Sequence, residues 1–330
     1  MRSALILARC VHPRLDPRSV VCSMHSGNGH AALSFEAMGC RFEVLIGIER
    51  SGLSGIECSA VCEEIRELVL DWHARLSVFD DRSVVSRINR SGAGESVEVD
   101  EEMLALLGLS ERMRERTGGA FNIAAGTLMH AHGFRERAID DVGGLSIENA
   151  FVLDLDARTI TKADGRIVLD FGAIAKGYVL DLIRAELMEL GIRDAFVHGG
   201  TSSVLALGED LEGRPWTVSA GGGVDVVLNG MTMGISEIDG SVVKRGERIE
   251  GHVMDPMGMG PARSGVSRVV CVHGSGAEAD AYSTACCVSP GIASRLSDDP
   301  CTLIVFEGDR AETMHDPLGV VRSISKDEDD

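Results

Sequence analysis

The stretch IVLDFGAIAKG, residues 167–177, decides how the rest of this chain is interpreted. Its alternating apolar residues predict a strand over 166–171, then a turn, then a helix over 177–190 that ends at Gly191. A helix N-terminus attracts anions, because its first N–H groups are unpaired and its dipole is positive there. Lys176 adds a mobile positive charge, although the same residue types are also common as a turn aspartate and a surface lysine. The stretch is not a P-loop, because the GxxxxGKS/T pattern is absent.

Helical and strand-like patterns recur on both sides of this stretch. Because strands and helices follow one another without strict alternation, we predict an α+β fold with mixed β-sheets and packed helices. The other main elements that periodicity predicts lie at 34–48, 55–76, 100–117, 151–160, 195–207, 215–236, 268–274, 277–289 and 301–308.

Composition excludes several classes of protein. The chain has 330 residues, 44 % of them hydrophobic, which is too many for a disordered chain. Its formal net charge of −19 argues against a nucleic-acid binder, which needs a basic face for phosphates. No apolar run approaches the ~20 residues of a membrane span. The nine cysteines lack the spacing of a zinc site, so we expect buried thiols in a reducing compartment.

The two ends of the chain differ from its middle. We predict that residues 1–32 are a loose extension, that 33–310 form one domain, and that 311–330 are an acidic tail. The apolar patch at 4–8 is shorter than the core of a normal signal peptide and lacks a cleavage site. With no clear signal peptide, the sequence predicts a cytoplasmic protein.

Two further polar clusters could carry chemistry. His252 stands three residues before Asp255, where it could act as a general base or contact a phosphate; a structural histidine would fit as well. Asp280 and Thr284 are four residues apart on a predicted helix, so their oxygens share one face. A carboxylate and a hydroxyl make a partial shell for Mg²⁺, which completes its octahedron with water and phosphates. The alternative is an aspartate near a helix N-terminus and a threonine bonded to its own backbone.

Taken together, the order and spacing of these clusters closely resemble the ApbE family, the FAD:protein FMN transferases. The resemblance covers roughly residues 34–307. The matching segments are Met38-Gly39, SVFDDRSVVSRIN at 77–89, TGGAFN at 117–122, LDFGAIAKGY at 169–178, HGGTSSVLALG at 198–208, HVMDP at 252–256 and ADAYSTA at 279–285.

The resemblance implies a fold, a substrate and a set of contacts. It implies a T-fold-related, two-lobed architecture with FAD bound as substrate in a cleft between the lobes. The residues that would contact FAD are Met38, Phe79, Ala120, Phe121, Asn122, Asp170 and Lys176, with His252 near the pyrophosphate.

The resemblance also implies a metal site and an activity. Asp280, Thr284 and the backbone carbonyl of Ala173 would bind Mg²⁺. The metal would bridge the pyrophosphate while a Thr or Ser hydroxyl of an acceptor redox protein with a flavinylation motif attacks the FMN phosphorus and AMP leaves. Either His252 or Asp280 would take the hydroxyl proton, so both are candidate catalytic residues.

Two other functions stay open beside the transferase. The same site would make a FAD pyrophosphatase if water replaced the acceptor hydroxyl, and a non-catalytic FAD-binding protein would need no metal. The chain also departs from the family pattern: Cys40 replaces a threonine, Asn122 an acidic residue and Glu237 a glycine. Many relatives are exported lipoproteins, whereas no clear export signal is present here.

Overall fold

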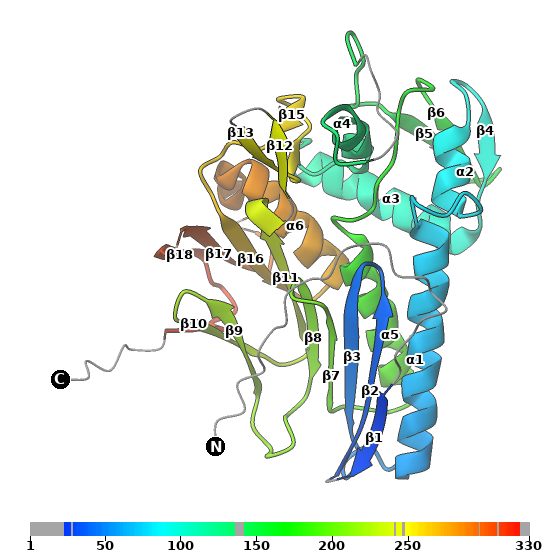
Figure 1. Cartoon of the computed structure of the whole chain (residues 1–330). Coiled ribbons are helices and arrows are strands. Elements are labelled where there is room, and N and C mark those ends of the chain that lie inside the picture. The colour runs from blue at the N-terminus through cyan, green and yellow to red at the C-terminus, as the bar shows by residue number, and fades with distance from the viewer. Residues whose placement is uncertain are drawn as a thin grey trace.

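A nine-stranded antiparallel sheet forms the centre of the computed structural model, which describes residues 23–27, 29–135, 142–240, 242–245, 248–296, 298–308 and 310–323. The sheet confirms the predicted α+β class (Figure 1). In spatial order its strands are β1 (Ser23–Gly27), β2 (His30–Ala37), β3 (Cys40–Gly47), β7 (Ala195–Gly199), β8 (Ser203–Leu207), β11 (Met231–Glu237), β16 (Arg268–His273), β17 (Thr302–Glu307) and β18 (Arg310–His315).

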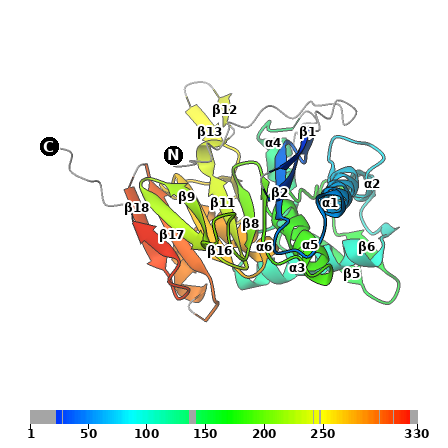
Figure 2. The ribbon, with the colours of Figure 1, turned by 90° about the horizontal axis from the view of Figure 1, so that it is seen from below.

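Three helices cover one face of this sheet. They are α1 (Gly55–Leu76), α5 (Ala175–Glu189) and α6 (Gly276–Val288). Helix α1 packs on β2, α5 packs on β8 and α6, and α6 packs on β11 and β16. Figure 2 shows α1 beside the blue strands at one end of the sheet and β18 at the other end.

A smaller sheet covers the other face of the C-terminal strands. It consists of β9 (Trp216–Gly221), β10 (Val224–Leu228) and β19 (Val321–Ser323). In β16, Val269 and Cys271 belong to the core on the helical side, whereas Val270 and Val272 belong to the core under the small sheet. This alternation with both sets buried explains why the strand reads as a continuous apolar run.

The remaining elements gather around the ends of the large sheet. Side chains accept the free N–H groups at two of the helix N-termini: Ser83 accepts from Ser86 N, and Asp100 accepts from Met103 N. These elements are α2 (Val84–Arg90), β4 (Ser96–Glu98), α3 (Glu101–Arg116), α4 (Gly126–Ala131), β5 (Phe151–Asp154), β6 (Thr159–Lys162), β12 (Val242–Arg245), β13 (Arg248–Gly251), β14 (Met254–Asp255), β15 (Gly260–Pro261) and the 3₁₀ turns η1 (Ile123–Ala125), η2 (Ile238–Gly240) and η3 (Pro290–Leu296).

The strand predicted over 166–171 is wrong. The segment is buried at Ile167 and Leu169, but it pairs with no other strand among the described residues. Side chains take the place of a strand partner: the amide of Asn89 accepts from Leu169 N at 2.8 Å and donates to Leu169 O at 2.9 Å. The buried ammonium of Lys162 donates to Ile167 O at 2.9 Å. Apolar alternation signals burial, and here the burial comes without a β-ladder.

Three other boundaries need correction. The strand predicted over 151–160 is a hairpin, because β5 ends at Asp154 and β6 begins at Thr159. The extension predicted as loose over 1–32 is wrong from Ser23 onward, where β1 pairs with β2. The tail predicted over 311–330 contains most of β18 and all of β19, both paired with other strands. Residues 1–22, with their apolar patch, and 324–330 lie outside the described part of the chain.

The cysteines agree with the prediction of buried thiols. All seven that the structure describes are buried and stand outside disulfide bonds, namely Cys40, Cys58, Cys62, Cys271, Cys286, Cys287 and Cys301. Within the described residues, no helix combines the length and the apolar character that a membrane crossing requires.

Candidate active site

Three segments of the chain meet where α5 begins. The carboxylate of Asp280, on α6, accepts a hydrogen bond from Gly177 N in the first turn of α5 at 2.7 Å. The hydroxyl of Ser203, at the start of β8, donates to the same carboxylate at 2.9 Å. Next to it, Lys176 Nζ donates to Ser202 Oγ. The predicted site residues Lys176 and Asp280 therefore share one corner, to which Ser202, just before β8, and Ser203, its first residue, contribute hydroxyls.

Glycines allow the two helices to come this close. A Cβ atom on Gly177 would lie 1.9 Å from Gly276 O, and one on Gly276 would lie 2.4 Å from Gly177 O. On the sheet side, a Cβ on Gly234 of β11 would lie 2.7 Å from the Ala279 backbone. Because no real Cβ fits at these distances, α6 sits between β11 and α5 at backbone contact, and this places Asp280 against the N-terminus of α5.

Asp280 is a buried carboxylate with incomplete charge compensation. Burial raises the pKa of its carboxyl to about 6, against the opposing charge of Lys176 and the hydrogen bonds from Gly177 and Ser203. Among the described residues, no Lys, Arg or His forms an ion pair with it. A carboxylate in this setting is suited to a cation that comes from outside the protein.

Thr284 lies on the same face of α6, one turn after Asp280. Its hydroxyl is 2.9 Å from Ser236 Oγ, which is also 2.8 Å from Ser283 Oγ. Ala173 stands two residues before α5, in the turn that leads into the helix. These three residues offer a carboxylate, a hydroxyl and a carbonyl oxygen, and such a set of hard oxygen donors fits Mg²⁺.

Asp170 forms a second corner, six residues before Lys176. Its carboxylate pairs with Arg135 at 2.5 Å and accepts from Gly172 N at 2.8 Å. Burial pushes the pKa of Asp170 upward, but the charge and hydrogen bond of Arg135 and the Gly172 N–H outweigh it, so this pKa lies below its usual value. The Arg135 guanidinium also lies 5.5 Å from the centre of the Phe79 ring, which is 62 % exposed. Arg135 thus joins two predicted FAD contacts.

Met38 lies in the tight turn between β2 and β3. It has a left-handed backbone with φ of 50°, which is uncommon for a residue with a side chain. Its N–H donates to Nδ1 of His73 on α1 at 3.3 Å. Burial lowers the pKa of His73, against the opposing charge of Asp80, and this favours the neutral ring that accepts the bond. The turn is therefore held against the start of the segment that carries Phe79.

The segment at 120–122 turns its side chains into the protein. Ala120, Phe121 and Asn122 are all buried. The Asn122 amide donates to Ile147 O at 2.7 Å and accepts from Ala124 N at 2.8 Å. The first of these bonds needs an N–H donor, which a carboxylate lacks, so asparagine suits this position. A contact from Asn122 to FAD stays a prediction.

His252 lies between β13 and β14, beside the turn that follows β11. Its Cε1 would be 3.4 Å from a Cβ on Gly240, the last residue of η2. That turn directly continues β11 beyond Ser236, the partner of Thr284. The histidine therefore lies beside η2, the turn that continues from the strand whose Ser236 contacts Thr284.

The comparison with known families agrees with this geometry. Residues 38–297 match the model of the ApbE family. The chain belongs to the ApbE family. The match spans every predicted site residue, from Met38 to Thr284.

Curated relatives in the ApbE family carry one name. A FAD:protein FMN transferase of Rhodobacter capsulatus is 29 % identical over 283 residues, which are 77 % of this chain and 52 % of the relative. One of Treponema pallidum is 26 % identical and is aligned over 84 % of this chain and 86 % of its own length. The chain spans about half the length of the first two curated relatives, at 52 % and 49 %.

Solved structures in the ApbE family share the fold. The ApbE protein of Thermotoga maritima superposes with a TM-score of 0.75 at 24 % identity, over 86 % of this chain and 96 % of that one. The flavin transferase ApbE of Vibrio cholerae gives 0.72 at 21 % identity, over 88 % and 97 %. At these identities the likeness shows the fold alone.

Sequence reasoning missed several residues of this ApbE site. Ser202, Ser203 and Arg135 lie in loops or at strand starts, where no periodicity singles them out. Ser236, the partner of Thr284, precedes the departure at Glu237, and no periodicity singles it out either. The sequence gives one indication of the two serines: the Gly-rich turn at 199–200 just before them, since glycines are typical where the backbone closely approaches another group.

Proposed function

We propose that this chain is a Mg²⁺-dependent flavin transferase that moves FMN from FAD to a Thr or Ser hydroxyl of an acceptor redox protein and releases AMP. One observation carries the proposal: the buried carboxylate of Asp280 lies against the N-terminus of α5 beside Lys176, and no described residue forms an ion pair with it. The curated relatives, which are FAD:protein FMN transferases, support the same activity.

The reaction exchanges one bond at phosphorus. The acceptor oxygen forms a bond to the phosphorus on the FMN side of FAD, and the bond from that phosphorus to the bridging oxygen breaks. AMP leaves with the electron pair, and the hydroxyl proton passes to His252 or Asp280. Bound Mg²⁺ supplies positive charge that neutralises the pyrophosphate oxygens.

The residues around this corner prepare it for a dinucleotide. The N-terminus of α5 and the Lys176 ammonium both attract the pyrophosphate, while Ser202 holds that ammonium in place. Asp280, Thr284 and the Ala173 carbonyl would hold the metal on the other side. Phe79 offers an exposed ring for flavin contact, and the Arg135–Asp170 pair steadies its surroundings.

Intact-mass spectrometry tests the proposal. An acceptor with a Thr-containing flavinylation motif is incubated with the protein, FAD and Mg²⁺, and with EDTA as a control. We expect the acceptor to gain the mass of one FMN in the absence of EDTA only. Free FMN and AMP with an unmodified acceptor would show a pyrophosphatase instead, and intact FAD would show a binding protein.

One variant and its control assign the proton acceptor. With His252→Gln, loss of transfer with unchanged Mn²⁺ binding would identify His252 as the base. Retained transfer would leave Asp280 in that role. Glu189→Gln, an exposed change on α5, serves as the matched control.

A further inference from the structure

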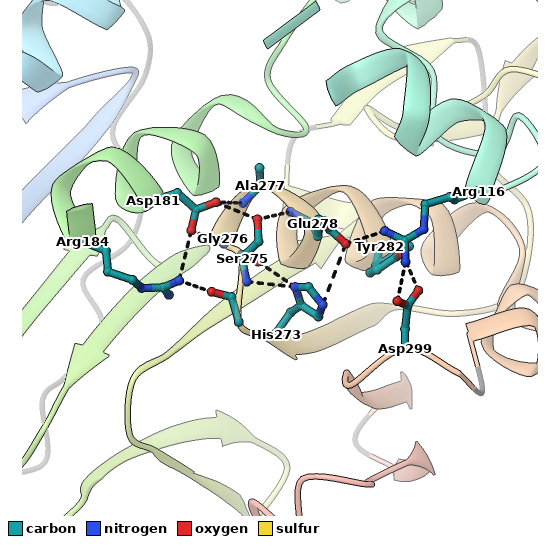
Figure 3. A network of polar contacts seen from close by, with 11 residues as sticks. Arg116, Asp181, Arg184, His273, Ser275, Gly276, Ala277, Glu278, Tyr282 and Asp299 are labelled. Atoms are coloured by element: carbon teal, nitrogen blue, oxygen red, sulfur yellow. Dashed lines mark hydrogen bonds and ion pairs between the residues drawn. The ribbon is translucent and has the colours of Figure 1, made fainter. Parts of the chain in front are cut away.

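Asp181 caps a helix other than its own. It lies on α5, and its carboxylate accepts hydrogen bonds from the first backbone N–H groups of α6: Gly276 N at 2.6 Å and Ala277 N at 3.0 Å. The hydroxyl of Ser275, the N-cap residue of α6, donates to it at 2.7 Å. Figure 3 shows Asp181 pointing from α5 at the start of α6.

Each of the two helices supplies a carboxylate that accepts hydrogen bonds from the N-terminal N–H groups of the other. Asp181 of α5 binds the N-terminus of α6, and Asp280 of α6 binds Gly177 N in the first turn of α5. Between the two hydrogen-bonded carboxylates, Gly177 and Gly276 are in backbone contact. The two helices are thus joined at their N-terminal ends by two carboxylates and one contact without side chains, so that a shift of either helix breaks both sets of bonds.

Arginines fix the two flanks of this joint. Arg184 lies 3.4 Å from Asp181 and donates to Thr232 Oγ1 on β11 at 2.5 Å. At the other side of Figure 3, Arg116 pairs with Glu278 at 2.8 Å and with Asp299. The two carboxylates beside His273 both form ion pairs with Arg116, so this cluster braces α6.

We propose that Asp181 is a positioning residue of the transfer reaction. It fixes α6 against α5 and thereby sets Asp280 and Thr284 opposite the turn from Ala173 to Lys176. The inference rests on the proposed function, because that function requires both sides of this corner to hold one metal ion and one dinucleotide. A residue that only capped α6 would affect the first turn of α6 and nothing on α5.

Hydrogen exchange in the metal-free protein separates these two roles. In Asp181→Asn, the amide side chain can accept one N–H but faces the other with its own NH₂ group. We expect faster exchange both at 275–278, where the cap is weakened, and at 175–178, where Gly177 N loses its fixed partner Asp280. Faster exchange at 275–278 alone would overturn the proposal. Glu189→Gln, on the same helix and exposed, should match the wild type.

Binding of Mn²⁺, followed by electron paramagnetic resonance, measures the consequence for the metal. We expect Asp181→Asn to bind Mn²⁺ about tenfold more weakly while unfolding cooperatively, since residues that orient metal ligands affect affinity by about 10- to 100-fold. Arg184→Gln, which leaves the cap itself intact, should show a smaller loss. Wild-type affinity in Asp181→Asn would contradict the proposal.

The hydrogen-exchange and Mn²⁺-binding experiments also distinguish a failure of the role of Asp181 from a failure of the proposed function. A wild-type protein that binds no Mn²⁺ with or without FAD would contradict the metal-dependent transferase. The exchange experiment would still decide whether Asp181 fixes α5 to α6, because it needs neither metal nor FAD.

Discussion

The two corners of the site hold similar carboxylates in opposite electrostatic settings. Asp170 has its counterion inside the protein, Arg135 at 2.5 Å, and its pKa lies below the usual value. Among the described residues Asp280 has no ion-pair partner; it accepts hydrogen bonds from Gly177 and Ser203, and burial raises its pKa to about 6 against the nearby charge of Lys176. The charge of the first carboxylate is balanced within the protein by Arg135, whereas the charge of the second is balanced only in part, by the nearby Lys176.

Removal of the Asp280 carboxylate should have the largest effect. We expect Asp280→Asn to lower the rate of FMN transfer by roughly 100- to 1,000-fold, as loss of a group that stabilises developing charge does elsewhere. The free energy of unfolding of the metal-free protein should not fall, because a buried charge has been removed. Transfer by mass spectrometry and urea denaturation measure the two quantities. A rate close to wild type would place the metal elsewhere.

Removal of the internal counterion should act on stability. Arg135→Gln leaves the Asp170 carboxylate, 11 % exposed, without its cation, and we expect the free energy of unfolding to drop by about 2 kcal/mol. The double variant Arg135→Gln/Asp170→Asn should recover most of this loss, because no uncompensated charge remains. Urea denaturation of the four proteins gives the coupling energy. Additive losses would show that the pair is not coupled.

The pH dependence should distinguish the two corners. The pKa of Asp280 is higher in the folded protein than its ordinary 3.8, so protonation favours folding. The metal-free protein should therefore lose stability as pH rises from about 4 to about 6. Because a metal ion binds the ionised carboxylate, the affinity for Mn²⁺ should fall about tenfold for each pH unit below about pH 6. Above that pH the affinity should level off. In Asp280→Asn this dependence should vanish; its persistence would assign it to another group.

The smallest effect is expected from one hydrogen bond. Ser203→Ala removes a donor to Asp280, which should raise the pKa of that carboxyl further and weaken Mn²⁺ binding about threefold. Ser96→Ala removes the exposed hydroxyl that bonds Thr161 and serves as control, with no change expected. Mn²⁺ titration near pH 6 measures both variants. Equal affinity in wild type and Ser203→Ala would show that the serine does not tune Asp280.

The sequence was sufficient for elements whose stability is local. Helix α1 begins and ends where periodicity predicts. Ser54 caps it by accepting from Glu57 N, and Ser54 N donates in return to the Glu57 carboxylate. The prediction from sequence failed where residues far away in the chain determine the local structure. Residues 167–170 have a strand pattern, but Asn89 and Lys162 take the place of the missing strand. Strand β1 is likewise defined by its pairing with β2, which no short window of sequence contains.

The site residues show the same difference between local and distant determinants. The spacing of Asp280 and Thr284 predicts their common face, because four residues make about one helical turn. Nothing local in the sequence points to Ser203 or Arg135, since each gains its role from a partner 77 or 35 positions away. Asn122 shows the converse: a residue in a recognisable motif can direct its polar atoms to nearby backbone.

The joint between α5 and α6 also bears on when the site can form during folding. Its hydrogen bonds link residues 94 to 103 positions apart. Contacts of such separation form only after the intervening chain has been ordered, because loop closure costs entropy first. The corner around Asp280 is therefore completed late in folding. A nascent chain that has emerged only as far as residue 275 carries Lys176 and the whole LDFGAIAKGY segment, yet it lacks Asp280 and the rest of α6.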